Sequence, residues 1–312
     1  MDGLIAKVVV CLSLLSLLMG CAPTESPTPA ASTTEPNGRA LVLGDISDEA
    51  AETIKGTQPT ADYLAAQLAD FGITHGEVKI APDLETMIAW MANGEVDLYF
   101  DSPYPALVIS QQTGAVPILR RLKYGVPQYH SVFFTRANAD LQSAADLTGQ
   151  VVAFEEPFST SGYMLPLAYL LEQGLNPVEK TGLETAVSPN EIGYVFSTAD
   201  NTTLQWVISG LVPAGVTDNV TFSRLPAETQ AELAIIAETE EVPRQLVLVR
   251  AGLEEALVAK IKSELLQMDE NEAGQTALET FLTTEFTEFP EGPEKALAQM
   301  QQIYDMVQAQ QR

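Results

Sequence analysis

The segment 152–166 (VAFEEPFSTSGYMLP) holds the residues whose types and spacing point most directly to a chemical task. An apolar run ends in a loop with a proline, and three hydroxyl residues follow in succession: Ser159, Thr160 and Ser161. At a helix start such residues present hydroxyls beside backbone N–H groups that have no partner within the helix, and the helix dipole adds about half a positive charge. The pattern predicts an anion-binding site.

Gly162 follows the three hydroxyl residues and supports this interpretation, because a residue without a Cβ lets an oxyanion approach the backbone. Serine and threonine also cap helices where no ligand binds, so plain capping stays open as the alternative from these residues alone.

Residues for covalent or metal chemistry are scarce. Both cysteines lie within the first 21 residues, so the remainder of the chain has no thiol for a disulfide, a zinc site or a nucleophile. His75 and His130 are far apart in sequence, which argues against a histidine-rich metal site. A serine hydrolase using Ser159 or Ser161 with His130 is the enzyme alternative, but there is no Gly-x-Ser-x-Gly elbow. We therefore expect no catalytic residue, no metal and no cofactor.

The composition restricts the partners of the chain. With 312 residues, 46% of them hydrophobic, the chain can bury one large core or two medium ones. The formal charge of −26 argues against nucleic-acid binding, since no basic patch outweighs that field.

Strands and helices alternate from residue 40 onward and must position the anion site. Strands are predicted at 40–47, 77–83 and 95–100, and helices at 59–71, 84–93 and 104–113, each helix ending before a glycine. This order predicts a mostly parallel sheet with helices on both faces. Because ligands bind beyond the carboxyl ends of such strands, the loops with Ser47, Asp101 and Ser102 are candidate binding loops.

An extended stretch at 124–134 predicts a crossing to a second α/β lobe. There we expect strands at 150–154, 192–196 and 212–216 and helices at 159–173 and 201–209. A strand at 244–249 would return to the first lobe, with helices at 253–268, 274–282 and 293–308 after it. The expected domains are lobe 1 at 40–126 and 240–312 and lobe 2 at 127–239. Two lobes joined by two crossings form a hinge that closes on a ligand.

The segment 157–166 (PFSTSGYMLP), with DLTG at 146–149 and LLEQGLNP at 170–177, resembles the signature of the phosphate/phosphite/phosphonate-binding receptors of ABC importers. The resemblance continues in GEVDL at 94–98, around Tyr129, and from 243 to 250. It implies a type II periplasmic-binding-protein fold and a phosphorus oxyanion held by the Ser-Thr-Ser-Gly helix start. It also implies that Tyr104 faces the cleft, that Tyr129 belongs to the hinge region and that the partners are an ABC permease and ATPase.

The chain departs from the family pattern at two loops. It has FDSPY at 100–104, where many members have a neutral residue before the proline, and STAD at 197–200 in place of a Ser-His pair. A carboxylate in an anion cleft repels a fully ionised ligand but accepts a hydrogen bond from a P–OH or an ammonium group. We therefore expect Asp101 and Asp200 to select a protonated phosphate or phosphite, or an aminoalkyl phosphonate; a solvated loop position is the alternative.

Several side chains have more than one interpretation. Tyr104, Tyr129 and Tyr163 are either hydroxyl donors or packing residues. The basic run Arg120, Arg121 and Lys123 either lines the cleft entrance or, as short charge runs usually do, forms a solvated face. A receptor of the same fold for a sulfonate, thiamine precursor or metal chelate also stays open, as does a ligand-sensing partner of a membrane signalling protein.

The N-terminus predicts export and a lipid anchor. Lys7 precedes the apolar run 8–19, which has the length of a signal-peptide core and is too short to span a bilayer. The run ends in LMGC at 18–21, which resembles a lipobox with Cys21 as the acylated residue. We expect a signal peptide at 1–20 and a flexible tether at 21–39. The expected protein is an extracytoplasmic, membrane-anchored monomer, with the choice of membrane left open.

Overall fold

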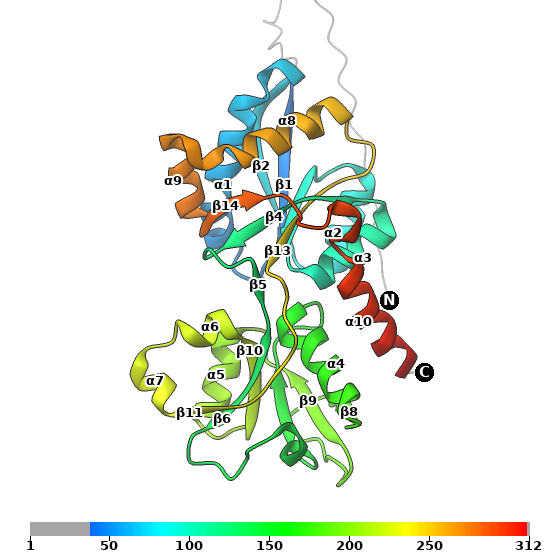
Figure 1. Cartoon of the computed structure of the whole chain (residues 1–312), viewed down its shortest axis with the longest axis vertical. Helices are drawn as coiled ribbons and strands as arrows, with labels where there is room; N and C mark the ends of the chain where they lie inside the picture. Colours follow the sequence, from blue (N-terminus) through cyan, green and yellow to red (C-terminus); the bar gives the residue numbers. More distant parts are fainter. Residues whose placement is uncertain (1–37, 311–312) are drawn as a thin grey trace, which may run out of the picture. The chain divides into compact units, whose positions relative to one another are not determined.

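The computed structural model describes residues 38–310, which contain two six-stranded sheets and one two-stranded sheet (Figure 1). The predicted signal peptide, Cys21 and nearly all of the predicted tether lie outside the described residues. No helix within 38–310 has the length and apolar character needed to cross a membrane.

The first sheet has the strand order β14-β4-β13-β3-β1-β2. Its strands are β1 (Arg39–Ile46), β2 (Ile73–Ala81), β3 (Leu98–Asp101), β4 (Val116–Lys123), β13 (Gln245–Val249) and β14 (Thr283–Thr287). β1 is parallel to β2 and β3, whereas β13 is antiparallel to both β3 and β4. We call this sheet with its helices lobe 1: α1 (Ala50–Gln67), α2 (Leu84–Asn93), α3 (Pro103–Thr113), α8 (Glu255–Leu266) and α9 (Glu272–Thr280).

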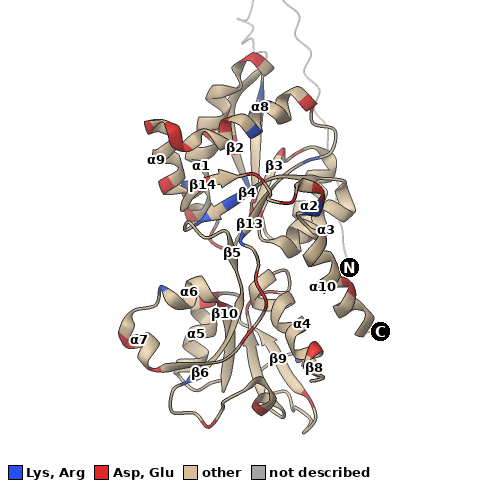
Figure 2. Ribbon diagram, viewed as in Figure 1, with Lys and Arg blue, Asp and Glu red and all other residues tan. Residues whose placement is uncertain are grey.

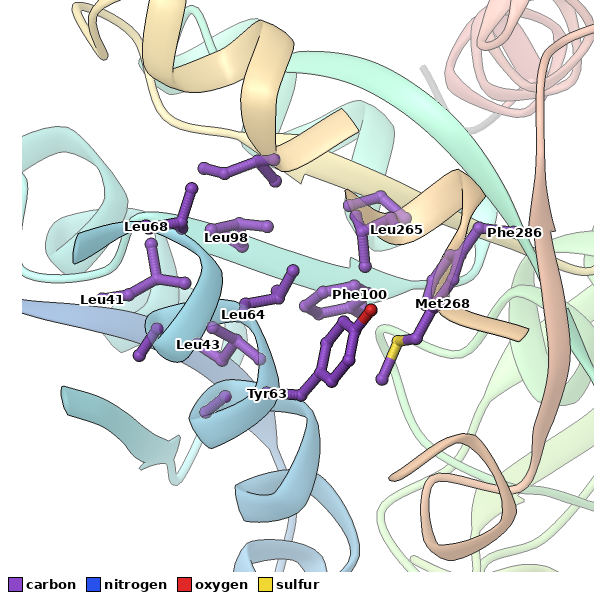
Figure 3. Packing of buried hydrophobic residues seen from close by; sticks show 14 of the residues in the cluster. Leu41, Leu43, Tyr63, Leu64, Leu68, Leu98, Phe100, Leu265, Met268 and Phe286 are labelled. Carbon is purple, nitrogen blue, oxygen red and sulfur yellow. The ribbon is translucent and has the colours of Figure 1, made fainter. Parts of the chain in front are cut away.

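The core of lobe 1 joins strands near the start of the chain to helices near its end. Leu41 and Leu43 of β1 lie against Leu64 of α1, and Phe100 of β3 lies close to Leu265 of α8 (Figure 3). All belong to one buried hydrophobic cluster. Burying each such side chain stabilises the folded lobe by about 1.5–3 kcal/mol. The C-terminal segment that contains α8 is therefore needed to complete the core of lobe 1.

The second sheet has the strand order β11-β6-β10-β7-β9-β8. Its strands are β6 (Ser131–Arg136), β7 (Val151–Phe154), β8 (Pro177–Glu179), β9 (Ile192–Phe196), β10 (Ala214–Asp218) and β11 (Leu233–Glu238). β7 is parallel to β9 and β10, and β6 is antiparallel to β10 and β11. We call this sheet with its helices lobe 2: α4 (Leu165–Glu172), α5 (Asp200–Ile208), α6 (Asn219–Ser223) and α7 (Ala227–Ala231).

A two-stranded sheet forms the hinge between the lobes. β5 (Gln128–Tyr129), which follows β4, pairs antiparallel with β12 (Val242–Pro243), which leads into β13. The chain thus crosses twice between the six-stranded sheets, in the order expected from the sequence (Figure 1).

The last helix, α10 (Ala298–Gln310), contacts both lobes. Met300, Ile303 and Val307 belong to the buried cluster that includes α4 and β7 of lobe 2. Gln301 accepts a hydrogen bond of 2.6 Å from the side chain of Gln111 in α3 of lobe 1. The helix therefore forms a further connection between the lobes beside the hinge.

The first helix is longer than the pattern indicated. The sequence predicted it at 59–71, but α1 begins at Ala50 and contains Pro59 in its interior. A proline there removes one backbone hydrogen bond, and the burial of Ala61, Leu64 and Ala65 against the sheet compensates for that loss. The predicted C-terminal turn is a separate 3-10 turn, Ala69–Phe71, before Gly72.

Candidate functional site

A cavity of about 530 Å³ lies between the lobes and is lined by strand ends of both sheets and by the hinge. This is the location that the strand-end rule predicted. Among the polar side chains that line the cavity are Asp45, Ser47, Asp101, Ser102, Arg121, Lys123, Tyr129, Glu155, Glu156, Ser159, Ser161, Asp200, Asp218, Arg244 and Gln245.

The predicted helix start borders this cavity from lobe 2. β7 ends at Phe154, and after a short loop the helix begins with a π-helical turn, Thr160–Met164, that continues into α4. Ser159 is the N-cap, and its Oγ accepts a hydrogen bond of 2.9 Å from the N–H of Gly162. Ser159 and Ser161 both line the cavity.

Thr160 and Gly162 lie beneath the cavity wall and do not line it. Thr160 is 1% exposed, and its Oγ1 accepts from the N–H of Tyr104 and donates to Oγ of Ser102, each at 2.9 Å. A Cβ on Gly162 would lie 2.3 Å from Cβ of Glu155. The close approach that this glycine permits is therefore that of Glu155.

The two predicted tyrosines have different surroundings. Tyr129 lines the cavity, and the Arg244 guanidinium carbon lies 4.3 Å from its ring centroid. Tyr104 does not line the cavity; its ring lies 6.2 Å from those of Tyr163 and Tyr304, measured between centroids. Burial raises the pKa of both hydroxyls to about 12, so both are neutral donors at ordinary pH.

Lobe 1 presents the predicted loop residues at the ends of β1 and β3. Asp101 accepts hydrogen bonds from the backbone N–H and hydroxyl of Ser102, at 2.6 and 3.0 Å, and from the hydroxyl of Tyr99. Ser47 Oγ accepts a bond of 2.8 Å from the hydroxyl of Thr53. Asp45, which the sequence analysis missed, also lines the cavity, and burial followed by the nearby Asp101 raises its pKa to about 7.

The structure corrects the interpretation of the basic run on β4. The sequence favoured a solvated face, but Arg121 is 4% exposed and both Arg121 and Lys123 line the cavity. Figure 2 shows basic residues on β4, next to the hinge. The prediction failed because β4 is an interior strand between β13 and β14, so it is covered by segments distant in sequence.

Burial also changes the acidity of these two cations. Arg121 is held by the hydroxyl of Thr283 at 2.8 Å and by the carbonyl of Phe281, and burial lowers its pKa to about 9. Burial, reinforced by the charge of Arg121, lowers the pKa of Lys123 to about 8. An anion in the cavity would favour the charged form of both.

The segment that leads from the hinge into β13 contributes two polar side chains that sequence reasoning also missed, Arg244 and Gln245. Arg244 is 8% exposed, and its Nη2 lies 3.8 Å from Oδ2 of Asp218. Nε of Arg244 and Oε1 of Gln245 have no hydrogen-bond partner among the described residues. Both residues line the cavity, and buried polar groups are normally hydrogen-bonded, so a ligand can supply the missing partners.

Lobe 2 contributes carboxylates, of which only Asp200 was predicted. Burial, then the charge of Asp200, raises the pKa of Glu155 to about 8, and burial raises that of Glu156 to about 7. Asp200 accepts a hydrogen bond of 2.7 Å from the hydroxyl of Thr217, and burial raises its pKa. Asp218 caps α6 through the N–H groups of Val220 and Thr221, both at 2.9 Å.

The lining has more acidic than basic side chains. With Glu49 and Glu52, eight carboxylates line the cavity against three cations. Residues 38–310 contain no group of three or more His, Cys, Asp or Glu arranged to hold a metal ion. The arrangement can bind an oxyanion at its donors while its carboxylates accept hydrogen bonds from other parts of the same ligand.

Comparison with known proteins decides the family. A family model described as "ABC transporter, phosphonate, periplasmic substrate-binding protein" matches residues 44–291, which is more than half of the chain. The chain belongs to this family. The resemblance noted from the Ser-Thr-Ser-Gly segment is thereby confirmed. The phosphonate-binding family consists of transport substrate-binding proteins and not of enzymes, which excludes the serine hydrolase alternative.

A curated relative is the phosphate-import protein PhnD of Mycolicibacterium smegmatis, which is 31% identical over 189 residues. That match covers 59% of this chain and spans 56% of the relative's length.

Solved structures confirm the fold class. XAC2383 from Xanthomonas citri, solved with ATP bound, has a TM-score of 0.79 at 27% identity and covers 86% of this chain and 97% of its own. PhnD1 from Prochlorococcus marinus, in complex with methylphosphonate, has a TM-score of 0.68 at 19% identity, with 88% and 99% covered. The type II periplasmic-binding-protein fold predicted from the sequence is therefore confirmed.

Proposed function

We propose that this chain is the extracytoplasmic receptor of an ABC importer and that it binds phosphate, phosphite or a phosphonate in the cavity between its lobes. One observation carries the proposal: the helix start with Ser159 and Ser161 lines the same cavity as the cations Arg121, Lys123 and Arg244. Hydroxyls, free N–H groups and cationic donors are the partners that a phosphorus oxyanion requires.

Among these ligands, the acidic lining favours an aminoalkylphosphonate. Asp101 and Asp200 add acceptors beside the donors, and acidic side chains outnumber cations in the lining by eight to three. An ammonium group offers three hydrogen-bond donors and a compensating charge, which a bare oxyanion lacks. We therefore expect aminoethylphosphonate to bind more tightly than phosphate, phosphite or methylphosphonate.

A nucleotide is the second candidate, because the similar X. citri structure contains ATP and the cavity of about 530 Å³ has the size of a typical small-molecule site. The acidic lining opposes a ligand with several negative charges, so we expect ATP to bind more weakly than a phosphonate.

Titration calorimetry of the purified protein tests the ligand. The panel is phosphate, phosphite, methylphosphonate, aminoethylphosphonate, sulfate and ATP. Tightest binding of aminoethylphosphonate is the expected result. Tightest binding of sulfate would reject the phosphorus ligand, and tightest binding of ATP would favour the nucleotide.

The membrane anchor is proposed from the sequence LMGC at 18–21. Acylation of Cys21 would hold the protein at the membrane, with residues 22–39 as the tether to the lobes and a permease and ATPase as partners. In cell fractionation, Cys21→Ser should move the protein to the soluble fraction. Cys11→Ser, which changes the other cysteine, should leave it with the membrane. Membrane association of both variants would contradict the anchor.

A further inference from the structure

Glu155 places a carboxyl group at the helix start, where the proposed function puts the ligand oxyanion. Its Oε2 accepts a hydrogen bond of 2.6 Å from Oγ of Ser159, and that Oγ accepts from the N–H of Gly162 at 2.9 Å. The backbone N–H of Glu155 donates to the carbonyl of Gly162 at 3.0 Å. The residue is therefore fixed over the first turn by both its backbone and its side chain.

This arrangement affects what Ser159 can do. A serine hydroxyl has one proton, and in this structure Ser159 gives it to Glu155. Ser159 cannot donate the same proton to a ligand while Glu155 accepts it. A second oxyanion beside an ionised Glu155 would also face direct charge repulsion.

We propose that Glu155 is an internal oxyanion of this site and makes ligand binding depend on a proton. Its ionised form competes with the ligand for the helix start, whereas its neutral acid can donate a hydrogen bond to the ligand oxyanion. The inference rests on the proposed function and assigns Glu155 as a residue that determines which ionic state of the cavity accepts the ligand.

The groups around Glu155 favour the neutral acid. Carboxylates face it from three elements: Glu156 in its own loop, Asp200 at the start of α5 and Asp218 at the end of β10. Two cations act on these neighbours: Arg244 lies 3.8 Å from Asp218, and both Arg244 and Lys123 interact electrostatically with Asp200. Burial and these carboxylates raise the pKa of Glu155 to about 8. The neutral, binding-competent form thus predominates below about pH 8 and is lost as the pH rises above it.

The test compares the pH dependence of affinity in the wild-type protein and in Glu155→Gln, which keeps the shape but not the charge. The probes are phosphite and methylphosphonate, because neither carries an ammonium group that could bind a carboxylate. The dissociation constants of both proteins are measured from pH 6.5 to 9.5. The quantity compared is the dissociation constant of the wild type divided by that of Glu155→Gln. The titration of the ligand and of Lys123 affects both proteins equally and therefore cancels in this ratio.

If only neutral Glu155 permits binding, the ratio should be constant below pH 7.5. At pH 9 it should have risen about tenfold, because about a tenth of Glu155 is then neutral. A ratio that does not change with pH would overturn this inference alone. No binding of either anion by either protein at any pH would overturn the inference, and the absence of phosphate and aminoethylphosphonate binding as well would overturn the proposed function.

Glu172→Gln is the matched control, because Glu172 is an exposed carboxylate at the end of α4 and does not line the cavity. Its ratio should not change with pH over the same range; a change equal to that of Glu155→Gln would assign the effect to net charge and overturn the inference. If Glu155→Gln does not fold, carboxyl ¹³C NMR of the wild type replaces it. The Glu155 signal should titrate near pH 8 without methylphosphonate and at higher pH with it, and identical titrations would overturn the inference.

Discussion

Thr160 of lobe 2 donates a hydrogen bond to Ser102 of lobe 1 across 2.9 Å, hydroxyl to hydroxyl. The same Thr160 oxygen accepts a hydrogen bond from the N–H of Tyr104, which lies in the first turn of α3. Thr160 stands between Ser159 and Ser161, which line the cavity. The central hydroxyl of the helix start therefore joins the lobes while its neighbours face the cavity, so lobe closure and the binding geometry depend on one short segment.

Thr160→Val removes this cross-lobe contact while keeping the side-chain shape. The N–H of Tyr104 loses its partner, which should cost about 1–3 kcal/mol of unfolding free energy in urea denaturation. Since the closed arrangement is weakened, the affinity for methylphosphonate should also fall in calorimetry. Thr135→Val is the control, because the buried Thr135 hydroxyl donates to the carbonyl of Pro213 within lobe 2. Thr135→Val should lose stability but keep its affinity for methylphosphonate. Unchanged affinity in Thr160→Val would show that the cross-lobe contact does not contribute to ligand binding.

Gly162→Ala tests whether Glu155 needs the space above the helix start. The new Cβ would lie 2.3 Å from Cβ and 2.5 Å from Oε2 of Glu155, so the loop must move. We expect a loss of about 1–3 kcal/mol in unfolding free energy and weaker anion binding. Gly182→Ala has nothing within 4 Å of its new Cβ and should change stability by less than about 0.5 kcal/mol. Equal stability of the two variants would contradict the close approach of Glu155 to Gly162.

Local patterns predicted those elements whose signals are contained in a single segment. The helix at 84–93 with Gly94 after it was predicted to the residue, because glycine supplies the left-handed φ of 75° that ends it. Ser159 and Ser161 line the cavity. The helix start alone left plain capping open, and the family resemblance carried the expectation of a ligand site there.

The cavity's charges were largely missed because their surroundings come from distant segments. Arg121 is covered by Thr283 and Phe281, which are far from it in sequence, so a basic run looked like a surface run. Glu155 follows β7 and Asp218 ends β10. No motif distinguishes either residue from an ordinary acidic residue of a loop. The apolar stripe of α10 likewise predicted a helix, but a stripe does not identify the α4 surface that it covers.

Asp97 should be the most sensitive carboxylate outside the cavity. It is 1% exposed and binds two arginines, Arg39 at 2.7 Å and Arg250 at 2.9 Å. Asp97→Ala leaves both without their partner, so we expect a loss of about 3–5 kcal/mol in denaturant unfolding. Glu52→Ala removes an exposed pair with Lys55 at 3.6 Å and should cost less than about 1 kcal/mol. Similar losses of unfolding free energy in both variants would show that the buried ion pairs of Asp97 stabilise the protein no more than the exposed pair does.

Lys123 should give anion binding a second pH dependence, separable from that of Glu155. Burial and Arg121 lower the lysine pKa to about 8, so its charge is present below that pH and is lost as the pH rises through it. In Glu155→Gln, affinity for methylphosphonate should therefore still fall by about thirtyfold from pH 7 to 9.5 if the charged lysine is required. Adding Lys123→Arg should flatten this fall, because arginine keeps its charge to higher pH. Adding Lys262→Arg instead, on the partly exposed residue paired with Glu288, should not. Parallel profiles for all three proteins would exclude Lys123 as the titrating group.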